Sequence, residues 1–205
     1  MRMRKAGGLL ALLAAAVALG GCEYTSTPDP TLSARDAQFM ASVPTASNGL
    51  NFERYQVDDV TGQAPGTVVV DTKESLLYYV MPNGKAIRYG VATGKEAYGW
   101  TGKATIKRMA EWPRWMPPAD MVQRWPHLKP VVAAGGLDGG PENPLGARAL
   151  YLYDSNGRDT LYRIHGTNEP ETIGHGASSG CIRMRNIDVI DLYNRVKPGA
   201  TVVVM

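Results

Sequence analysis

The chain has 205 residues, a length typical of a single domain with or without a tail. Its formal net charge of +3 comes from Arg2, Arg4 and Lys5, because residues 1–21 contain no acidic side chain. The rest of the chain is formally neutral and carries no nucleic-acid-binding motif, which argues against a nucleic-acid partner.

The N-terminus has the pattern of an export signal. A positively charged start precedes an apolar run over residues 6–19, which is shorter than the ~20 residues that span a bilayer. The run ends in Leu19-Gly20-Gly21-Cys22, which resembles a bacterial lipoprotein box, in which the cysteine is lipidated and becomes the first mature residue. We therefore expect a signal peptide over 1–21, lipidation at Cys22 and a periplasmic protein attached to a membrane. An ordinary signal peptide is the alternative.

Glu23 differs from the aspartate that retains enteric lipoproteins in the inner membrane, so the outer membrane is favoured. If Cys22 carries lipid, Cys181 has no partner within the chain. An unpaired thiol in an exported protein indicates either chemistry or an intermolecular bond, and an inert buried cysteine is the alternative.

Residues 22–51 are rich in Ser, Thr, Pro and Ala, and we interpret them as a tether to the membrane anchor. The folded domain is expected over residues 52–205. Runs rich in β-branched and aromatic residues predict strands, and the first three suggest an antiparallel meander. These runs cover residues 67–73, 75–81, 86–94, 104–109, 148–154, 160–166 and 201–205.

Two turns and one helix complete the prediction. Turns are expected at residues 82–84 and at 155–158, the latter closing a hairpin. Asn186 is expected to cap a helix that ends at Pro198-Gly199, with Asp188 and Asp191 exposed to solvent. Many strands with one late helix predict a mainly β domain.

A long segment from Glu111 to Gly146 is dense in Trp, Pro and Gly. A loop of this length in a compact domain is usually functional or contains further structure. Trp112, Trp115 and Trp125 are costly to leave in water, so they either form the wall of a cleft or plug the end of the β core. We expect the segment to be lid-like, to lie over the site described next and to limit the entry of water.

Residues 164–184 contain His165, at the end of a predicted strand, and Cys181, sixteen residues later in a glycine-rich turn. A thiol with a pKa near ~8.5 needs a base to act as a nucleophile at neutral pH. A histidine held by a strand is suited to this role, and amides near Gly180 and Cys181 are suited to hold an oxyanion.

Three alternatives remain open from the residues alone. His175, which lies between two glycines, is a second candidate base. His165, His175 and Cys181 together are candidate metal ligands, although the spacing matches no familiar zinc pattern. The region is also compatible with a structural turn that has no chemistry.

The motifs HGTNEP (165–170), SSGCIRM (178–184) and DVIDLYNRV (188–196) resemble the L,D-transpeptidase catalytic domain, also called the YkuD domain. The resemblance covers roughly residues 52–205. Many members of that family have histidine where this chain has Ser179, which removes one polar contact. The resemblance implies a mainly β, sandwich-like fold and acyl transfer through a cysteine thioester, without metal or cofactor.

The resemblance also implies roles for individual residues. Cys181 is the expected nucleophile, His165 the base and then the acid, and the Gly166 carbonyl the group that orients the imidazole. The amides of Gly180 and Cys181 are the expected oxyanion donors. The residues expected to bind substrate are Arg183, Ser178 and Ser179, and a structural bond from Arg183 to a loop carbonyl is its alternative.

The implied acyl donor is a peptidoglycan stem tetrapeptide, which loses its terminal D-alanine. The implied acceptor is an amine, either of another stem, giving a 3→3 cross-link, or of a protein lysine. The alternatives are a hydrolase that uses the same thioester, either an L,D-carboxypeptidase or an amidase that detaches a wall-linked protein, and a non-catalytic peptidoglycan-binding lipoprotein.

Overall fold

The fold is known from a computed structural model, which describes residues 24–94, 101–176 and 180–205. The predicted signal peptide, Cys22, Ser178 and Ser179 lie outside these residues. None of the helices in the described part of the chain is long and apolar enough to cross a membrane.

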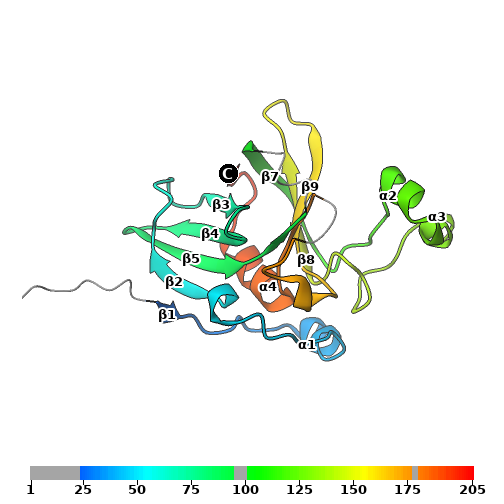
Figure 1. The fold of residues 1–205 in the computed structure, drawn as a ribbon, viewed down its shortest axis with the longest axis horizontal. Coiled ribbons are helices and arrows are strands. Elements are labelled where there is room, and N and C mark those ends of the chain that lie inside the picture. The colour runs from blue at the N-terminus through cyan, green and yellow to red at the C-terminus, as the bar shows by residue number, and fades with distance from the viewer. Residues whose placement is uncertain (1–23, 95–100, 177–179) are drawn as a thin grey trace, which may run out of the picture.

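Within the described residues, eleven strands form one mixed sheet in the order β1-β2-β5-β4-β3-β11-β7-β8-β9-β10-β6. Figure 1 shows that the sheet bends, so that its β2–β5–β4–β3 half and its β7–β8–β9 half face a common interior that contains α4. The strands are β1 (Thr25–Ser26), β2 (Tyr55–Asp58), β3 (Val68–Asp71), β4 (Leu76–Met81), β5 (Lys85–Gly90), β6 (Ala92–Thr93), β7 (Gly102–Glu111), β8 (Arg148–Tyr153), β9 (Asp159–His165), β10 (Ile182–Arg183) and β11 (Thr201–Val204). The prediction of a mainly β, sandwich-like domain is confirmed.

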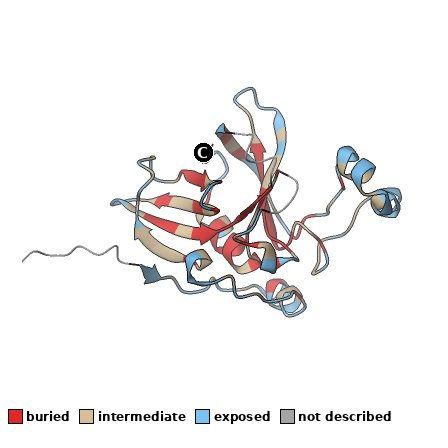
Figure 2. Ribbon diagram, viewed as in Figure 1, coloured by how far each residue is buried: buried red, intermediate tan, exposed pale blue. Residues whose placement is uncertain are grey.

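The hydrophobic core explains why these runs become strands. Inward-facing residues from both halves of the sheet and from α4 form one buried cluster, which appears as the red interior of Figure 2. Burial of apolar surface at about 25 cal/mol per Å² is the main stabilising contribution of such a cluster. The predicted meander is present as β3, β4 and β5, which pair antiparallel.

The strands that pattern analysis missed are short or pair with distant segments. β10 has two residues and lies parallel to β9, and β2 pairs antiparallel with β5. Both predicted turns are present. Asn83 and Gly84 adopt positive φ between β4 and β5, and β8 pairs antiparallel with β9 around residues 155–158.

The helices are α1 (Ala34–Met40), α2 (Ala119–Arg124), α3 (Lys129–Ala133) and α4 (Asn186–Arg195), with 3-10 turns η1 (Leu50–Phe52), η3 (Pro126–Leu128) and η4 (Pro170–Thr172). α4 ends before the predicted Pro198-Gly199 because Val196 already has an extended backbone.

The prediction that Asp188 and Asp191 face solvent is wrong. They are 1% and 5% exposed. Asp188 accepts hydrogen bonds from Arg54 and Arg185, and Asp191 accepts from Tyr89 and Arg195. Burying a carboxylate is costly unless it is paired and hydrogen-bonded. These partners offset that cost, so the face of α4 that carries both aspartates can point into the domain.

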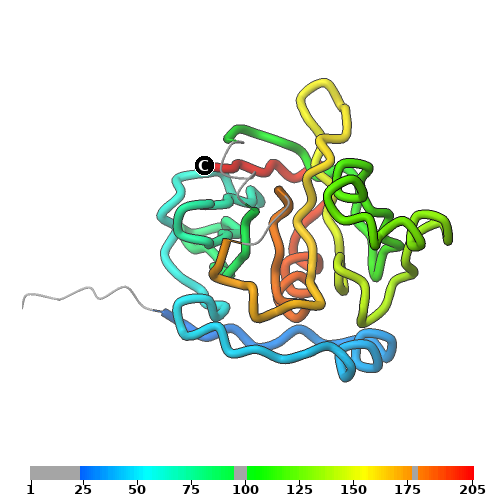
Figure 3. Tube along the Cα trace, turned by 45° about the vertical axis from the view of Figure 1, so that its right-hand side comes forward, coloured from blue at the N-terminus to red at the C-terminus, as the bar shows by residue number. Residues whose placement is uncertain are grey.

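The segment expected to be a free tether differs from that expectation. Residues 24–52 pack along one side of the domain in Figures 1 and 3, and α1 is part of them. Asp36, on α1, is 2% exposed and binds Arg148 with both oxygens at 2.8 Å, while Trp112 Nε1 donates to it at 2.8 Å. Phe39 packs edge-on against the Trp112 ring. We call residues 24–54 the strap. Sequence analysis did not predict that the strap packs on the domain, because the strap has few apolar residues. Polar contacts such as those of Asp36 anchor it instead.

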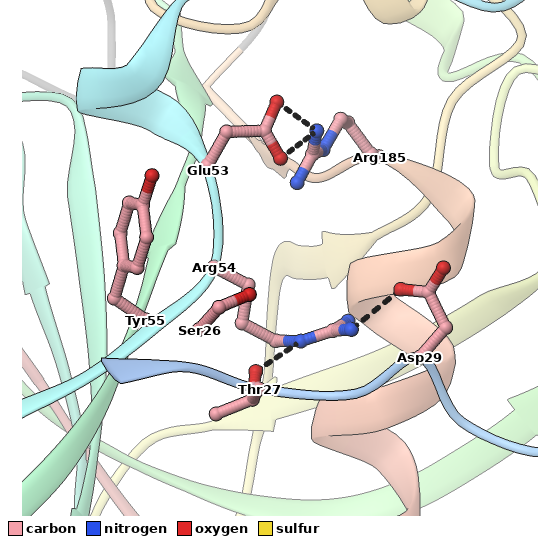
Figure 4. A pocket seen from close by; sticks show the side chains of 7 residues that line it. All are labelled: Ser26, Thr27, Asp29, Glu53, Arg54, Tyr55 and Arg185. Atoms are coloured by element: carbon pink, nitrogen blue, oxygen red, sulfur yellow. Dashed lines mark hydrogen bonds and ion pairs between the residues drawn. The ribbon is translucent and has the colours of Figure 1, made fainter. Parts of the chain in front are cut away.

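A polar pocket of about 260 Å³ lies where the strap meets the start of α4 (Figure 4). Arg54 in this pocket bonds Thr27 and Asp29 of the strap and Asp188 of α4, and Arg185 binds both oxygens of Glu53. Both arginines are therefore already paired with protein groups. Neither His165 nor Cys181 lines this pocket, so we interpret it as an anchor of the strap.

Candidate active site

His165 is the last residue of β9 and is 4% exposed. Its Nδ1 lies 2.6 Å from the carbonyl oxygen of Gly166. Because a carbonyl only accepts hydrogen bonds, this contact assigns the proton of the neutral ring to Nδ1. Nε2 then has a free lone pair, which is the arrangement that a general base requires.

Cys181 immediately precedes β10, the strand parallel to β9. The register pairs Ile182 with Ile164 and Arg183 with His165. Alternate residues of a strand share a face, so continuing the pattern one residue beyond β10 puts Cys181 on the same face as Arg183 and His165. Neighbours offset by two residues on adjacent strands are ~7–8 Å apart at the backbone, within reach of an imidazole. This register is compatible with the predicted pair, and the roles of His165 and Cys181 stay predictions.

Electrostatics keep both groups neutral. Burial and the nearby Arg183 charge lower the pKa of His165 to about 4, although the bond to Gly166 opposes this shift. Burial also raises the pKa of the Cys181 thiol, opposed by a main-chain hydrogen bond and the charge of Arg163. A neutral imidazole can accept the proton of a neutral thiol as the sulfur attacks.

Asn186 fixes the backbone next to His165, a role that sequence analysis missed. It was predicted to cap α4, but Arg185 is the capping residue and Asn186 is buried. Its Oδ1 accepts from the amides of Ala147 and Thr167, and its Nδ2 donates to the Thr167 carbonyl. Asn186 therefore holds the residue that follows Gly166.

A glycine is needed at position 166 because of this contact. A Cβ there would lie 2.1 Å from Asn186 Oδ1 and 2.9 Å from the Ala147 nitrogen. Only a residue without a side chain lets the chain pass so close to Asn186. Gly166 thus allows its carbonyl to stay in hydrogen-bond contact with the imidazole. In the sequence, the adjacent His165 and Gly166 were the feature that indicated this contact.

The strap reaches the loop that joins His165 to Cys181. Asn48 Nδ2 donates to the carbonyls of Pro170 and Ile173, at 2.9 and 3.3 Å. A Cβ at Gly174 would lie 2.5 Å from the Phe52 ring, so the two are in close contact. The strap is therefore one of the elements that hold this loop.

The remaining predicted residues have different surroundings. Gly180 is buried with φ of 70°, a conformation that lets the chain turn sharply before Cys181. Arg183 forms an ion pair with Glu169 at 2.9 Å. The expected partners were a carboxylate of the substrate or a loop carbonyl. His175 is exposed on the loop, whereas His165 is buried.

The segment from Glu111 to Gly146 contributes its base to the site. The Pro144 carbonyl lies close enough to the His165 ring to raise its pKa, and Asn168 donates to the Glu142 carbonyl. Asn143 is fully buried and bonds three carbonyls of the segment, those of Pro113, Leu137 and Asp138.

The middle of the segment, with α2 and α3, projects away from the domain (Figure 1). Trp112 is buried in the domain, while Trp115 and Trp125 are half-buried. The structure therefore places the base of the segment at the site, and a lid role for the projecting part stays a prediction.

Metal ligation was the remaining chemical alternative. Across residues 24–94, 101–176 and 180–205, no three His, Cys, Asp or Glu side chains are grouped so that they could hold a metal ion.

Comparison with known proteins places this arrangement in a family. The model of the YkuD L,D-transpeptidase catalytic domain matches residues 65–204. The chain is 35% identical over 144 residues to the probable L,D-transpeptidase ErfK/SrfK of Escherichia coli, covering 66% of this chain and 42% of that protein. It is 32% identical over 140 residues to the putative L,D-transpeptidase YqjB of Bacillus subtilis, covering 67% and 69% respectively. The chain belongs to the YkuD L,D-transpeptidase catalytic domain family.

A solved structure also matches. It is described as a probable carnitine operon oxidoreductase from Brucella melitensis, is 50% identical, covers 75% of this chain and 94% of its own, and gives a TM-score of 0.51. The matched region spans less than half of the length of the Escherichia coli relative.

Proposed function

We propose that this domain is a peptidoglycan L,D-transpeptidase that transfers the acyl group of a stem tetrapeptide through a thioester on Cys181. The observation that carries the proposal is the parallel register of β9 and β10, which pairs Arg183 with His165 and begins one residue after Cys181. The Gly166 contact, which leaves Nε2 unprotonated, supports His165 as the base.

Acylation begins when Nε2 of His165 takes the thiol proton as the sulfur attacks the carbonyl carbon next to the terminal D-alanine. The amides of Gly180 and Cys181 are the proposed donors to the oxyanion. As the C–N bond breaks, the imidazolium gives its proton to the departing amine, which leaves as D-alanine. Sulfur then holds the acyl group as a thioester.

Deacylation reverses these roles. An amine of a second stem peptide or of a protein attacks the thioester and loses its proton to Nε2 of His165. The C–S bond breaks, the thiol regains its proton and a new amide is released. Water competes with the amine, and a site that excludes water favours transfer over hydrolysis.

We also propose that the protein acts outside the cytoplasm, attached to a membrane through lipid on Cys22. The support is the sequence pattern of residues 1–22 alone. The stem peptide partner is consistent with that compartment.

The function is tested by incubating the purified protein with a stem tetrapeptide, with and without an amine acceptor, and analysing the products by mass spectrometry. We expect a 3→3 dimer when a second stem is present. Tripeptide alone in both reactions would indicate a hydrolase, and recovery of unreacted tetrapeptide would contradict the proposal.

The low pKa of His165 predicts an unusual pH profile. Because the base form is the neutral ring and its pKa is lowered to about 4, kcat/KM should stay level from pH 7 to about pH 5. It should then fall about tenfold per pH unit once most of the ring is protonated. A profile of initial rates measures this, and an acidic limb centred near pH ~6.5, the ordinary histidine value, would contradict the assignment.

A further inference from the structure

A row of side chains crosses the sheet beside Cys181. The register pairs Arg108 of β7 with Tyr151 of β8, and Tyr151 with Arg163 of β9. Continuing the β9–β10 register by one residue places Cys181 beside Arg163. Directly paired residues point to the same face of a sheet, so Arg108, Tyr151, Arg163 and Cys181 lie in one line on one face.

Two guanidinium groups stack on the ring in this row. Arg108 Cζ lies 4.2 Å from the centroid of Tyr151, and Arg163 Cζ lies 4.5 Å from it. The two arginines come from the strands on either side of β8, and Tyr151 between them is only 7% exposed. Cation–π contacts of this kind orient an arginine that would otherwise move freely.

The row carries more positive than negative charge. Asp159 binds Arg163 with both oxygens, at 2.7 and 2.9 Å. Arg108 is exposed, and among the described residues no carboxylate lies within ion-pair distance of it. The Asp159 carboxylate, which is bound to Arg163, also feels the charge of Arg108. The outer end of the row therefore presents an oriented guanidinium that shares one carboxylate with Arg163.

The spacing of the row matches a peptide held at the thiol. The Tyr151 ring lies two strands from Cys181, or roughly 10 Å at ~4.8 Å per strand. An extended peptide covers about 3.3–3.6 Å per residue, so this distance corresponds to about three residues. A stem peptide whose carbonyl meets Cys181 is thus long enough to reach the Tyr151 ring and the guanidinium groups stacked on it.

We propose that Arg108, held on Tyr151 beside Arg163, forms a subsite that binds a carboxylate of a stem peptide. This inference rests on the proposed function, since it names a contact made by the same substrate. A guanidinium fork matches a carboxylate with two parallel hydrogen bonds, and the excess charge of the row favours an anion. The carboxylate belongs either to the acyl donor or to the acceptor stem, and kinetics distinguish the two.

The test compares Arg108→Gln with the unchanged protein, varying the donor and the acceptor concentrations separately. Loss of a charge-assisted pair predicts a rise in KM of about tenfold or more for the stem peptide that is bound, with kcat little changed. Arg108→Lys should restore part of the affinity. Lys103→Gln, which removes an exposed charge from the same strand, serves as the matched control and should leave KM unchanged.

A second arm uses stem peptides with their carboxylates amidated one at a time. Amidation of the recognised carboxylate should raise KM for the unchanged protein and have no further effect in Arg108→Gln. If KM is unaltered in Arg108→Gln while the protein still makes its product, the subsite is wrong and the proposed function stands. If the unchanged protein turns over no stem peptide, both fail together.

Discussion

Replacing Cys181 by alanine is expected to lower the rate of acyl transfer by roughly 10³-fold or more, the scale of loss when a covalent nucleophile is removed. The physical reason is that the alanine variant lacks the thiol that forms the thioester and carries the acyl group. The rate is measured by release of D-alanine from a stem tetrapeptide. The variant should fold normally, because alanine is smaller and Cys181 is only partly buried.

His165 and His175 provide a matched comparison for this result. His165→Ala is expected to lower the rate by ~10²–10⁴-fold, the range for loss of a general base. His175→Ala should have little effect, because His175 is exposed. A full rate in Cys181→Ala, or a greater loss in His175→Ala than in His165→Ala, would overturn the assignment.

Replacing Asp36 by asparagine is expected to lower the free energy of unfolding by about 3–5 kcal/mol, the cost of removing one partner of a buried ion pair. The change leaves Arg148, which is 4% exposed, without its bidentate partner. Glu111 lies 4.0 Å from Arg148 and offsets part of the loss. Urea unfolding monitored by fluorescence gives the difference.

Asp29→Ala is the control for this prediction. Asp29 also pairs with an arginine of the strap region, but its side chain is 74% exposed and Arg54 keeps its bond to Asp188. Its loss should cost less than about 1 kcal/mol. Equal effects of the two changes would mean that the strap is not anchored through Asp36.

The Asp36 contribution should also depend on pH. Burial alone would raise the pKa of Asp36, but hydrogen bonds from Arg148, Ser33 and Trp112 lower it. A lowered pKa in the folded state means that the stabilisation is fully present above about pH 4 and is lost as the pH falls towards the folded-state value. The stability difference between the natural protein and Asp36→Asn should therefore shrink in acid.

Sequence analysis predicted a strand correctly where an apolar run pairs with the next apolar run along the chain. β3, β4 and β5 are such strands, since each buries β-branched or aromatic side chains and short turns join them. β10 was missed because two residues give no periodicity, and its position comes from a parallel pairing with β9. Yet β10 is the element that positions Cys181.

The polar interior was the part that the sequence could not predict. Asp36, Asp188 and Asp191 look like surface residues, because a local pattern does not show the arginines that meet them. Asn186 looked like a helix cap for the same reason, and its actual partners are Ala147 and Thr167. His165 and Cys181 were recognised because their motif is local.

The central claim is that Cys181 carries the acyl group, and mapping the covalent intermediate tests it most directly. The protein is mixed with a stem tetrapeptide without an amine acceptor, quenched in acid, digested and analysed by mass spectrometry. We predict the acyl tripeptide on the fragment that contains Cys181, and its release when an amine is added before the quench. Product formation with the acyl group on another residue, or with no adduct on a fully detected Cys181 fragment, would contradict it.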